Sequence, residues 1–263
     1  MSKGRILFCN VFPQAPAAAR ADLCITVRCM VLIAVDRAFG AASVGNEDEV
    51  ILGENDAFLD AVYFALDGFC YFLSIVDFKN NVGYFGIELE IDEAGKDDDY
   101  AEELLDIANM HKDLLYIKTD GSLDDGMELV SHPCTLDYHC NEFPWEDILH
   151  CAVRQGYRSH QTSTCGLHLH VNRNAFSDSQ EGQDEVISRI LYFVEHHWNE
   201  LLKFSRRSEY SMNRWAARYG YEHTPKAIMD KAKKGGNGRY AAVNLCNYHT
   251  VEFRLFRGTL KYN

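Results

Sequence analysis

The sequence predicts an α+β fold in which helices pack on one side of a largely antiparallel sheet. Of its 263 residues, 47% are hydrophobic and 25% are charged, the balance of a globular protein with enough apolar material for a sizeable core. Beyond residue 80, short stretches that alternate apolar and polar residues follow amphipathic stretches with helical spacing. Such alternation is typical of strands with one solvated face, which favours an antiparallel sheet over a buried parallel one.

The individual elements follow from these two periodicities. Strands are predicted at 83–92, 113–118, 126–131, 164–172, 239–246 and 249–257. Helices are predicted at 98–111, 144–156, 182–204 and 225–233. The second helix has Pro144 and acidic residues in its first turn, as helix starts often do.

The composition changes near residue 80 and divides the chain into two predicted parts. Residues 1–80 are apolar, rich in Ala and Phe, and contain no chemical motif, so they form an N-terminal region of unknown role. Within them, residues 57–72 have the apolar spacing of a helix. All motifs that carry chemistry lie in residues 82–263, which form the predicted functional domain.

The charge and the cysteines limit the classes of partner and the compartment. A formal net charge of −13 repels phosphate groups, so nucleic acid is not expected as a main partner. The apolar runs 23–35 and 61–78 contain charged residues, so no membrane segment is expected. Asn10 interrupts the short apolar stretch at the N-terminus, which argues against a secretion signal. Nine Cys without a CxxC pair indicate reduced thiols in a cytoplasmic protein.

Four predicted strands share a polar face that points to metal binding. When each strand is divided into its two faces, one face is apolar in all four. The opposite face carries Glu88 and Glu90 on the first strand, Glu128 on the third, His168, His170 and Asn172 on the fourth, and Glu252 and Arg254 on the last. Carboxylates at this density raise one another's pKa unless cations lie between them, so this face predicts a divalent-cation site.

The types of ligand on this face favour particular ions. Mixed Glu and His ligands suit Mg²⁺ or Mn²⁺, whereas a closed structural zinc site usually uses Cys. Arg254 beside the carboxylates suits a phosphate group that also contacts the ions. An E-x-E or H-x-H pair alone is common on a solvated strand face, so the prediction depends on the agreement of four strands.

Two loops offer further binding groups. Asp120 and Ser122 lie in a turn-like break, where they form a structural turn or contact substrate. The basic, glycine-rich segment KAKKGGNGRYAAVNL contains Lys234 and Arg239 beside glycines whose backbone amides could close over a triphosphate. It lacks the spacing of a P-loop, and a flexible surface loop is the alternative.

Three residues that resemble functional groups are assigned to packing. His196 and His197 lie in a predicted helix rich in Leu and Phe, where a satisfied helix histidine is expected. Nothing in the sequence around Cys165 lowers its pKa, so a packed thiol is expected there rather than a nucleophile.

Four stretches, FGIELEID, KTDGSLDDGMELVSHP, CGLHLHVNR and NLCNYHTVEFRLFRGTL, together are similar to those of a known family. Over residues 82–263 the chain resembles the amidoligase family of phages and bacteria, a branch of the carboxylate–amine ligases with the catalytic fold of glutamine synthetase and glutamate–cysteine ligase. The resemblance implies ATP-dependent amide-bond formation, in which ATP phosphorylates a carboxylate and an amine displaces the phosphate. It implies ATP and two or three Mg²⁺ or Mn²⁺ ions, with an amine and a glutamyl, small-molecule or peptide carboxylate as substrates.

The resemblance also implies roles for individual residues. The metal ligands it implies are Glu88, Glu90, Glu128, His168 and Glu252. The catalytic residues are Arg254, which contacts phosphate, His170 and Glu128. The nucleotide or substrate contacts are Arg239, Asn244 and Arg257, joined by Lys234 of the glycine-rich segment.

Departures from the family pattern leave other functions open. Relatives often carry Cys-rich zinc-ribbon segments before the catalytic region and continue with helical sequence after the last motif, so a C-terminal truncation is a further expectation. The first alternative is a metal-dependent hydrolase that uses His168 and His170 without ATP. The second is an inactive metal-binding fragment of an amidoligase.

Overall fold

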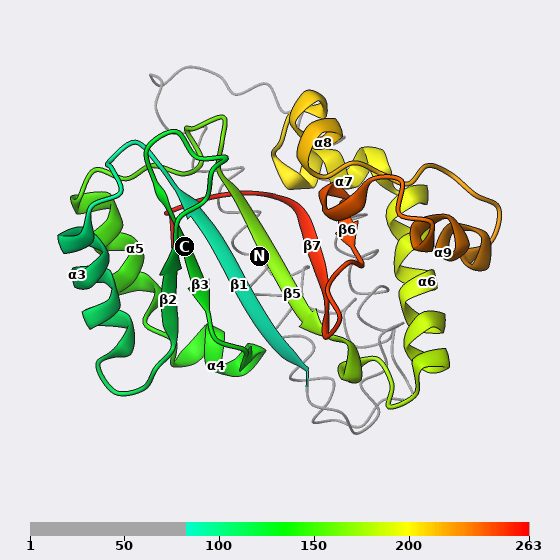
Figure 1. Cartoon of the computed structure of the whole chain (residues 1–263), viewed down its shortest axis with the longest axis horizontal. Coiled ribbons are helices and arrows are strands. Elements are labelled where there is room, and N and C mark those ends of the chain that lie inside the picture. The colour runs from blue at the N-terminus through cyan, green and yellow to red at the C-terminus, as the bar shows by residue number, and fades with distance from the viewer. Residues whose placement is uncertain (1–82, 263) are drawn as a thin grey trace, which may run out of the picture. The chain divides into compact units, whose positions relative to one another are not determined.

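The computed structural model describes residues 83–262, whose main feature is a seven-stranded sheet (Figure 1). The strands are β1 (Tyr84–Ile91), β2 (Leu115–Lys118), β3 (Met127–Ser131), β4 (Cys134–Thr135), β5 (Gly166–Asn172), β6 (Val243–Asn244) and β7 (Thr250–Arg257). Six of them run in the order β2–β3–β1–β5–β7–β6, and β4 pairs with the start of β1. All pairs are antiparallel, as predicted. The N-terminal region 1–80, with the helix predicted at 57–72, lies outside the described residues.

Helices and short turns connect the strands. They are α3 (Asp98–Asn109), α4 (Leu136–Asn141), α5 (Trp145–Arg154), α6 (Gln180–His196), α7 (Trp198–Ser205), α8 (Glu209–Trp215) and α9 (Pro225–Lys233), with 3₁₀ turns at Arg173–Ala175 and Gly238–Tyr240. Most of the α-helices begin with an N-cap residue whose side-chain oxygen accepts a hydrogen bond from the backbone amide three residues further on, as Asp97, Ser179 and Thr224 do. None of the helices that the structure describes is both long and apolar enough to cross a bilayer.

The helix predicted at 182–204 is in fact two helices, α6 and α7, which meet at His197. Phe193 and Trp198 are both buried in the same core cluster. Five residues apart on a straight helix, their side chains would point about 140° away from each other. The break at His197 therefore lets both aromatic side chains enter one core.

The strand predicted at 239–246 is wrong over most of its length, because only β6 pairs with β7. Gly235 and Gly238 have positive φ values of 74° and 53°, which side chains rarely tolerate and which turn the chain after α9. Just before β6, Tyr240 and Ala242 bond to the backbone of Ala217, and the Ala242 carbonyl oxygen also accepts a hydrogen bond from the Arg254 amide of β7. The local turn chemistry thus overrides the apolar pattern that suggested a strand.

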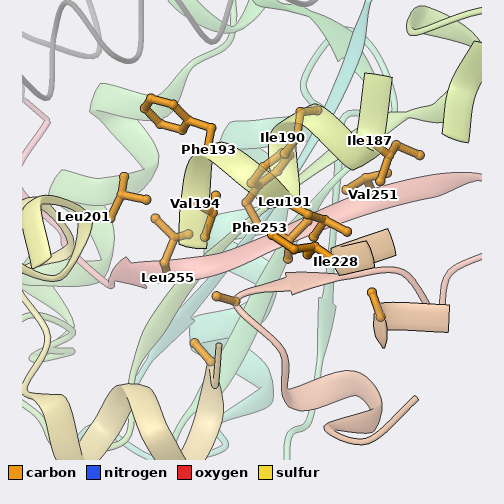
Figure 2. Close-up of a cluster of buried hydrophobic side chains, with 14 of the residues drawn as sticks. Ile187, Ile190, Leu191, Phe193, Val194, Leu201, Ile228, Val251, Phe253 and Leu255 are labelled. Carbon is orange, nitrogen blue, oxygen red and sulfur yellow. The ribbon is translucent and has the colours of Figure 1, made fainter. Parts of the chain in front are cut away.

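Two clusters of buried side chains lie on the apolar face of the sheet. One packs the apolar residues of β1, β2 and β3 against α3 and α5. The other packs those of β5 and β7 against α6, α7 and α9. Figure 2 shows part of the second cluster, with Ile187, Ile190, Leu191, Phe193 and Val194 of α6 near Val251, Phe253 and Leu255 of β7. The opposite face, which carries Glu88, Glu90, Glu128, His168 and Glu252, is called the polar face below.

β7 contains a bulge, because two of its residues, Arg254 and Leu255, lie opposite the single residue His168. An extra residue in one strand shifts the alternation of side chains beyond it by one position. Strict alternation would place Phe256 on the polar face after Arg254. The bulge places Arg257 there instead.

The start of β3 gives a test of the packing between strands. A Cβ atom at Gly126 would lie 2.6 Å from Asp92 Cα and even closer to the carbonyl oxygen of Ile91. Because backbone atoms cannot move away cheaply, we expect Gly126→Ala to lower the free energy of unfolding by about 1–3 kcal/mol, the usual cost of overpacking. Urea denaturation measures this loss.

Gly121→Ala is the matched control for this substitution, since no atom lies within 4 Å of a Cβ atom at Gly121. We expect it to change the free energy of unfolding by no more than about 0.5 kcal/mol, as a surface substitution does. An equal loss of stability in the two variants would contradict the close packing at Gly126.

Candidate metal centre

Strand pairing brings the predicted polar residues together on the polar face. β1 lies between β3 and β5, so Glu90 pairs with Glu128 and Glu88 pairs with His168. β5 in turn pairs with β7, which places Glu252 beside β5 as well. The polar rows of four strands that are distant in the sequence therefore lie next to one another, as the alternation predicted.

Five side chains form two overlapping groups of potential ligands, each with three ligand atoms within 4.8 Å of one another. Glu88, His168 and Glu252 form the Glu252 triad, and Glu90, Glu128 and His168 form the Glu128 triad. All but Glu88 are buried. Carboxylate oxygens with one imidazole nitrogen suit Mg²⁺ or Mn²⁺, and His168, which belongs to both groups, places the two groups side by side.

Neighbouring side chains hold Glu252 in a fixed orientation. Asn244 and Asn247 donate hydrogen bonds to its Oε2 atom, at 2.7 Å and 3.0 Å. Its Oε1 atom contacts the guanidinium of Arg254 and lies 3.7 Å from His168 Nδ1. Hydrogen bonds of this kind orient a potential metal ligand, so Asn244, expected to contact nucleotide or substrate, positions Glu252 in this structure.

The carboxylates of the two triads perturb one another. Burial and the nearby charge of Glu88 raise the pKa of Glu128 to about 7, although Lys118 opposes the rise. Burial alone would also raise the pKa of Glu88, but His168, His170 and Lys118 outweigh it and hold that pKa well below the ordinary value. A cation between the two carboxylates would favour the ionised form of both.

The part of the chain that contains both triads matches a known family. A family model described as "Putative amidoligase enzyme" matches residues 88–263. This chain belongs to that amidoligase family. No curated protein and no solved structure matches it. Membership confirms the resemblance noted in the sequence and supports a ligase-type activity for this amidoligase.

Lys118 lies beside both triads of this amidoligase, although the sequence pattern did not reveal it. Its Nζ atom lies 3.2 Å from Glu128 Oε2 and 3.6 Å from Glu88 Oε1. β2 pairs Lys118 directly with Glu128, and only the position of β2 at the edge of the sheet brings the two together. The ammonium group supplies part of the positive charge that these carboxylates require.

Removing Lys118 is expected to increase the dependence of stability on divalent cations. In Lys118→Met, Glu88 and Glu128 lose a cation that lies between them, so their repulsion grows when no metal is bound. We expect a lower Tm without metal and a larger rise in Tm with Mn²⁺ than in the wild type, by about 2–4 °C for each kcal/mol of difference. Thermal unfolding with EDTA and with Mn²⁺ measures both.

Lys226→Met is the control for the charge change, because Lys226 is an exposed residue of α9. We expect its Tm to respond to Mn²⁺ as that of the wild type does. A Lys118→Met protein with an unchanged response to Mn²⁺ would show that no cation binds beside Glu88 and Glu128.

The glycine at the start of β5 allows two ligands to approach the backbone closely. The amide of Gly166 donates a hydrogen bond to Glu90 Oε2. A Cβ atom at Gly166 would lie 3.1 Å from His168 Nε2 and 3.2 Å from Glu90 Oε2, which is tighter than most such contacts. Any side chain at this position would push the ligands of the Glu128 triad apart.

The two loops predicted to offer binding groups are the turn at Asp120 and the glycine-rich segment after α9. Asp120 and Arg239 interact with the charges of the polar face, and Lys234 does not form an ion pair with the described residues. The Ser122 amide donates to Asp120 Oδ1 at 2.6 Å, which confirms the predicted turn. Burial would raise the pKa of Asp120, but the Ser122 bonds and the charges of Arg239 and His168 lower it. Arg239 also interacts with the charge of Glu252. Lys234, the exposed C-cap of α9, forms no ion pair within residues 83–262.

Two other predicted residues lie beside the triads without belonging to them. His170 Nδ1 is 3.2 Å from Thr250 Oγ1, and its Nε2 lies 3.3 Å from Glu88 Oε1 without a hydrogen bond between them. The guanidinium of Arg257 donates to two main-chain carbonyl oxygens, those of Arg206 and Thr162, at 3.3 Å and 3.4 Å.

The assignment of Cys165 to packing is confirmed, and His196 is packed as well, but its buried Nε2 atom has no hydrogen-bond partner among the described residues, so it is not the fully satisfied histidine that was expected. Cys165 is buried, and burial raises the pKa of its thiol to about 11, so it is a poor nucleophile at neutral pH. His196 ends α6, with Nδ1 at 2.8 Å from the Tyr192 carbonyl oxygen and its ring against the Tyr192 ring. Neither residue belongs to a triad.

Proposed function

We propose that this amidoligase uses ATP and Mg²⁺ or Mn²⁺ to join a carboxylate to an amine through an acyl phosphate. The observation that carries this proposal is the pair of triads that share His168, with Arg254 beside them, inside the matched region. The carboxylate in this proposal belongs to a glutamyl residue, another small molecule or a peptide. The antiparallel sheet with all these ligands on one face supports a catalytic domain like that of glutamine synthetase.

The proposed reaction has two steps. A carboxylate oxygen attacks the γ-phosphorus of ATP, and ADP leaves with the electrons of the broken P–O bond. The amine nitrogen then attacks the carbonyl carbon of the acyl phosphate, phosphate leaves, and the nitrogen loses a proton. Because the first step brings two anions together, it requires positive charge between them. Ions held by the two triads would supply that charge and polarise the phosphoryl oxygens.

Residues around the triads have separate proposed roles. Arg254 binds the transferred phosphoryl group, since its guanidinium lies 3.5 Å from His168 Nδ1 at the edge of the triads. Arg239 and Lys234 bind the triphosphate. The glycines between them support this role, because a Cβ atom built on any of these glycines would have no other atom within 4 Å, which leaves open space beside their backbone amides. His170 contacts the substrate amine beside Glu88, and Glu128 is both metal ligand and catalytic residue.

The hydrolase alternative has less support. An H-x-H hydrolase uses both histidines as ligands of the same ion. Here His168 belongs to both triads, whereas His170 belongs to neither and contacts Thr250. Two carboxylate-rich sites that share one histidine suit phosphoryl transfer better, since magnesium-type ions prefer oxygen ligands.

Trapping the acyl phosphate tests the proposed function. The protein would be incubated with ATP, Mg²⁺ or Mn²⁺, hydroxylamine and mixtures of acidic amino acids and glutamyl peptides. We expect hydroxamate and ADP to form in equal amounts in the wild type, and neither to form in Glu88→Gln, which lacks a ligand of the Glu252 triad. Metal binding without ADP formation would favour an inactive module, and the absence of metal-dependent ATP binding would contradict the ligase proposal.

A further inference from the structure

A basic cavity of about 470 Å³, largely open to solvent, lies where α7 and β7 end. It is lined by His160, Leu202, Lys203, Arg206, Arg207 and Arg257. Four of these side chains are permanently cationic and none is acidic, although the chain as a whole has a net charge of −13. Such a concentration of positive charge in an acidic protein predicts an anionic ligand.

The cationic groups of this cavity form no ion pair with a carboxylate of the described residues, although the charge of Glu90 acts on Arg207. Within residues 83–262, neither Lys203 nor any of the three arginines forms an ion pair. The guanidinium of Arg207 donates instead to neutral oxygens, the carbonyl of Arg254 at 2.9 Å and Ser211 Oγ at 3.2 Å. Neutral acceptors orient a guanidinium but leave its charge available to an anion.

The arginines also act on one another. Burial lowers the pKa of Arg207, and the charges of Arg254 and Arg257 lower it further, although Glu90 opposes them. Like charges brought together in a partly buried place are unfavourable unless an opposite charge balances them. A bound anion would provide that balance.

The backbone of Arg206 adds a separate observation. It ends α7 in the left-handed conformation, with φ 61° and ψ 14°, where glycine is the usual residue. A side chain in this conformation strains the backbone, because its Cβ atom crowds the carbonyl oxygen that follows. Strained residues of this kind concentrate at functional sites, and here the strained residue is one of the cations that line the cavity.

Gly166 lies next to both the Glu128 triad and the cavity. A Cβ atom at Gly166 would lie 3.2 Å from Glu90 Oε2 and 3.4 Å from Arg207 Nη1. The bulge in β7 pairs Arg257 with Gly166, on the polar face. One small molecule could therefore reach the metal centre with one end and the basic cavity with the other.

We propose that this cavity binds a second anionic group of the carboxylate substrate, which is therefore a dianion such as a dicarboxylic acid. This inference rests on the proposed function, which places the reacting carboxylate of the substrate at the triads. Arginine forks match the geometry of carboxylate and phosphate groups, and no carboxylate in the described part of the chain lines the cavity to hold a metal there. A substrate carboxylate and a nucleotide phosphate are both anions that arginine binds. Of these two ligands, we assign the substrate carboxylate to the cavity.

Calorimetric titration of the full chain with glutarate, in the presence of Mg²⁺ and ADP, tests this assignment. We expect wild-type protein to bind glutarate, and Arg206→Gln and Arg257→Gln each to weaken binding about 10-fold, because a hydrogen bond to a charged group contributes about 1.5–3 kcal/mol. Lys203→Gln tests a third residue of the cavity, one that is exposed. Lys226→Gln, at an exposed position of α9, is the control, and we expect it to bind glutarate with wild-type affinity. Thermal unfolding checks that each variant is folded.

Three outcomes would overturn the inference. These are the absence of glutarate binding, equal glutarate affinity in the wild type and all cavity variants, and weaker binding of ADP but not glutarate in the cavity variants. The last outcome would assign the cavity to nucleotide phosphate. The titration involves no turnover, so it can succeed where the ligase assay fails. A ligase that turns over while the cavity variants bind glutarate normally would retain the proposed function and lose this inference.

Discussion

Replacing His168 by glutamine is expected to remove divalent-cation binding at both triads and to abolish ADP formation. His168 is the residue that the Glu252 triad and the Glu128 triad share, and its side chain is only 4% exposed. Loss of a residue that only hydrogen-bonds to a metal ligand already lowers metal affinity about 10–100-fold, so loss of the shared ligand itself should lower Mn²⁺ affinity by at least about 100-fold. Calorimetric titration with Mn²⁺ measures this change, and ADP release in the presence of ATP measures the loss of activity.

Two other histidines provide controls for this substitution. His111 is exposed in the loop between α3 and β2 and belongs to neither triad, so His111→Gln should bind Mn²⁺ with wild-type affinity. His170→Gln should keep Mn²⁺ affinity within about 10-fold, because His170 contacts Glu88 without belonging to a triad. Equal losses for His168→Gln and His170→Gln would support the H-x-H hydrolase instead, and no loss for His168→Gln would contradict the metal centre.

Replacing Arg254 by alanine is expected to separate phosphoryl transfer from metal binding. Its guanidinium contacts Glu252 and lies 3.5 Å from His168 Nδ1, so its positive charge competes with a cation at the Glu252 triad. We therefore expect Mn²⁺ affinity to stay the same or rise. Because an arginine that stabilises a transferred phosphoryl group contributes about 10³–10⁵ in rate, we expect ADP formation to fall by at least about 10³-fold. Stopped assays of ADP release measure the rate.

Arg254→Lys distinguishes the charge of Arg254 from its geometry. Lysine keeps the positive charge but loses the planar fork that binds two phosphate oxygens, so part of the activity should return. Thermal unfolding of both variants is required, since Arg254 also donates to the Trp215 carbonyl oxygen at 3.3 Å. ADP formation at the wild-type rate in Arg254→Ala would contradict the phosphate contact. Loss of Mn²⁺ binding would show that Arg254 acts through the position of Glu252.

The sequence by itself determined the content of the polar face. Alternation along a strand has a period of two, so Glu88 and Glu90 must share a face, and His168 must lie on the face opposite Leu167 and Leu169. This rule needs no knowledge of partners, because it follows from the pleat of a single strand. The turn at Asp120 could also be predicted from neighbouring residues alone, since the short Asp120 side chain accepts a hydrogen bond from the amide two residues further on.

Only the tertiary structure decided which rows meet and where the alternation breaks. Lys118 reaches Glu128 because β2 pairs with β3, and no local pattern reveals that pairing. Arg257 reaches the polar face because a bulge opposite His168 inserts one extra residue. Both results depend on contacts between segments distant in the chain, where side-chain packing and interstrand hydrogen bonds fix the register. The sequence thus set the chemistry of each strand, and the packing of the strands assembled the two triads and the basic cavity beside them.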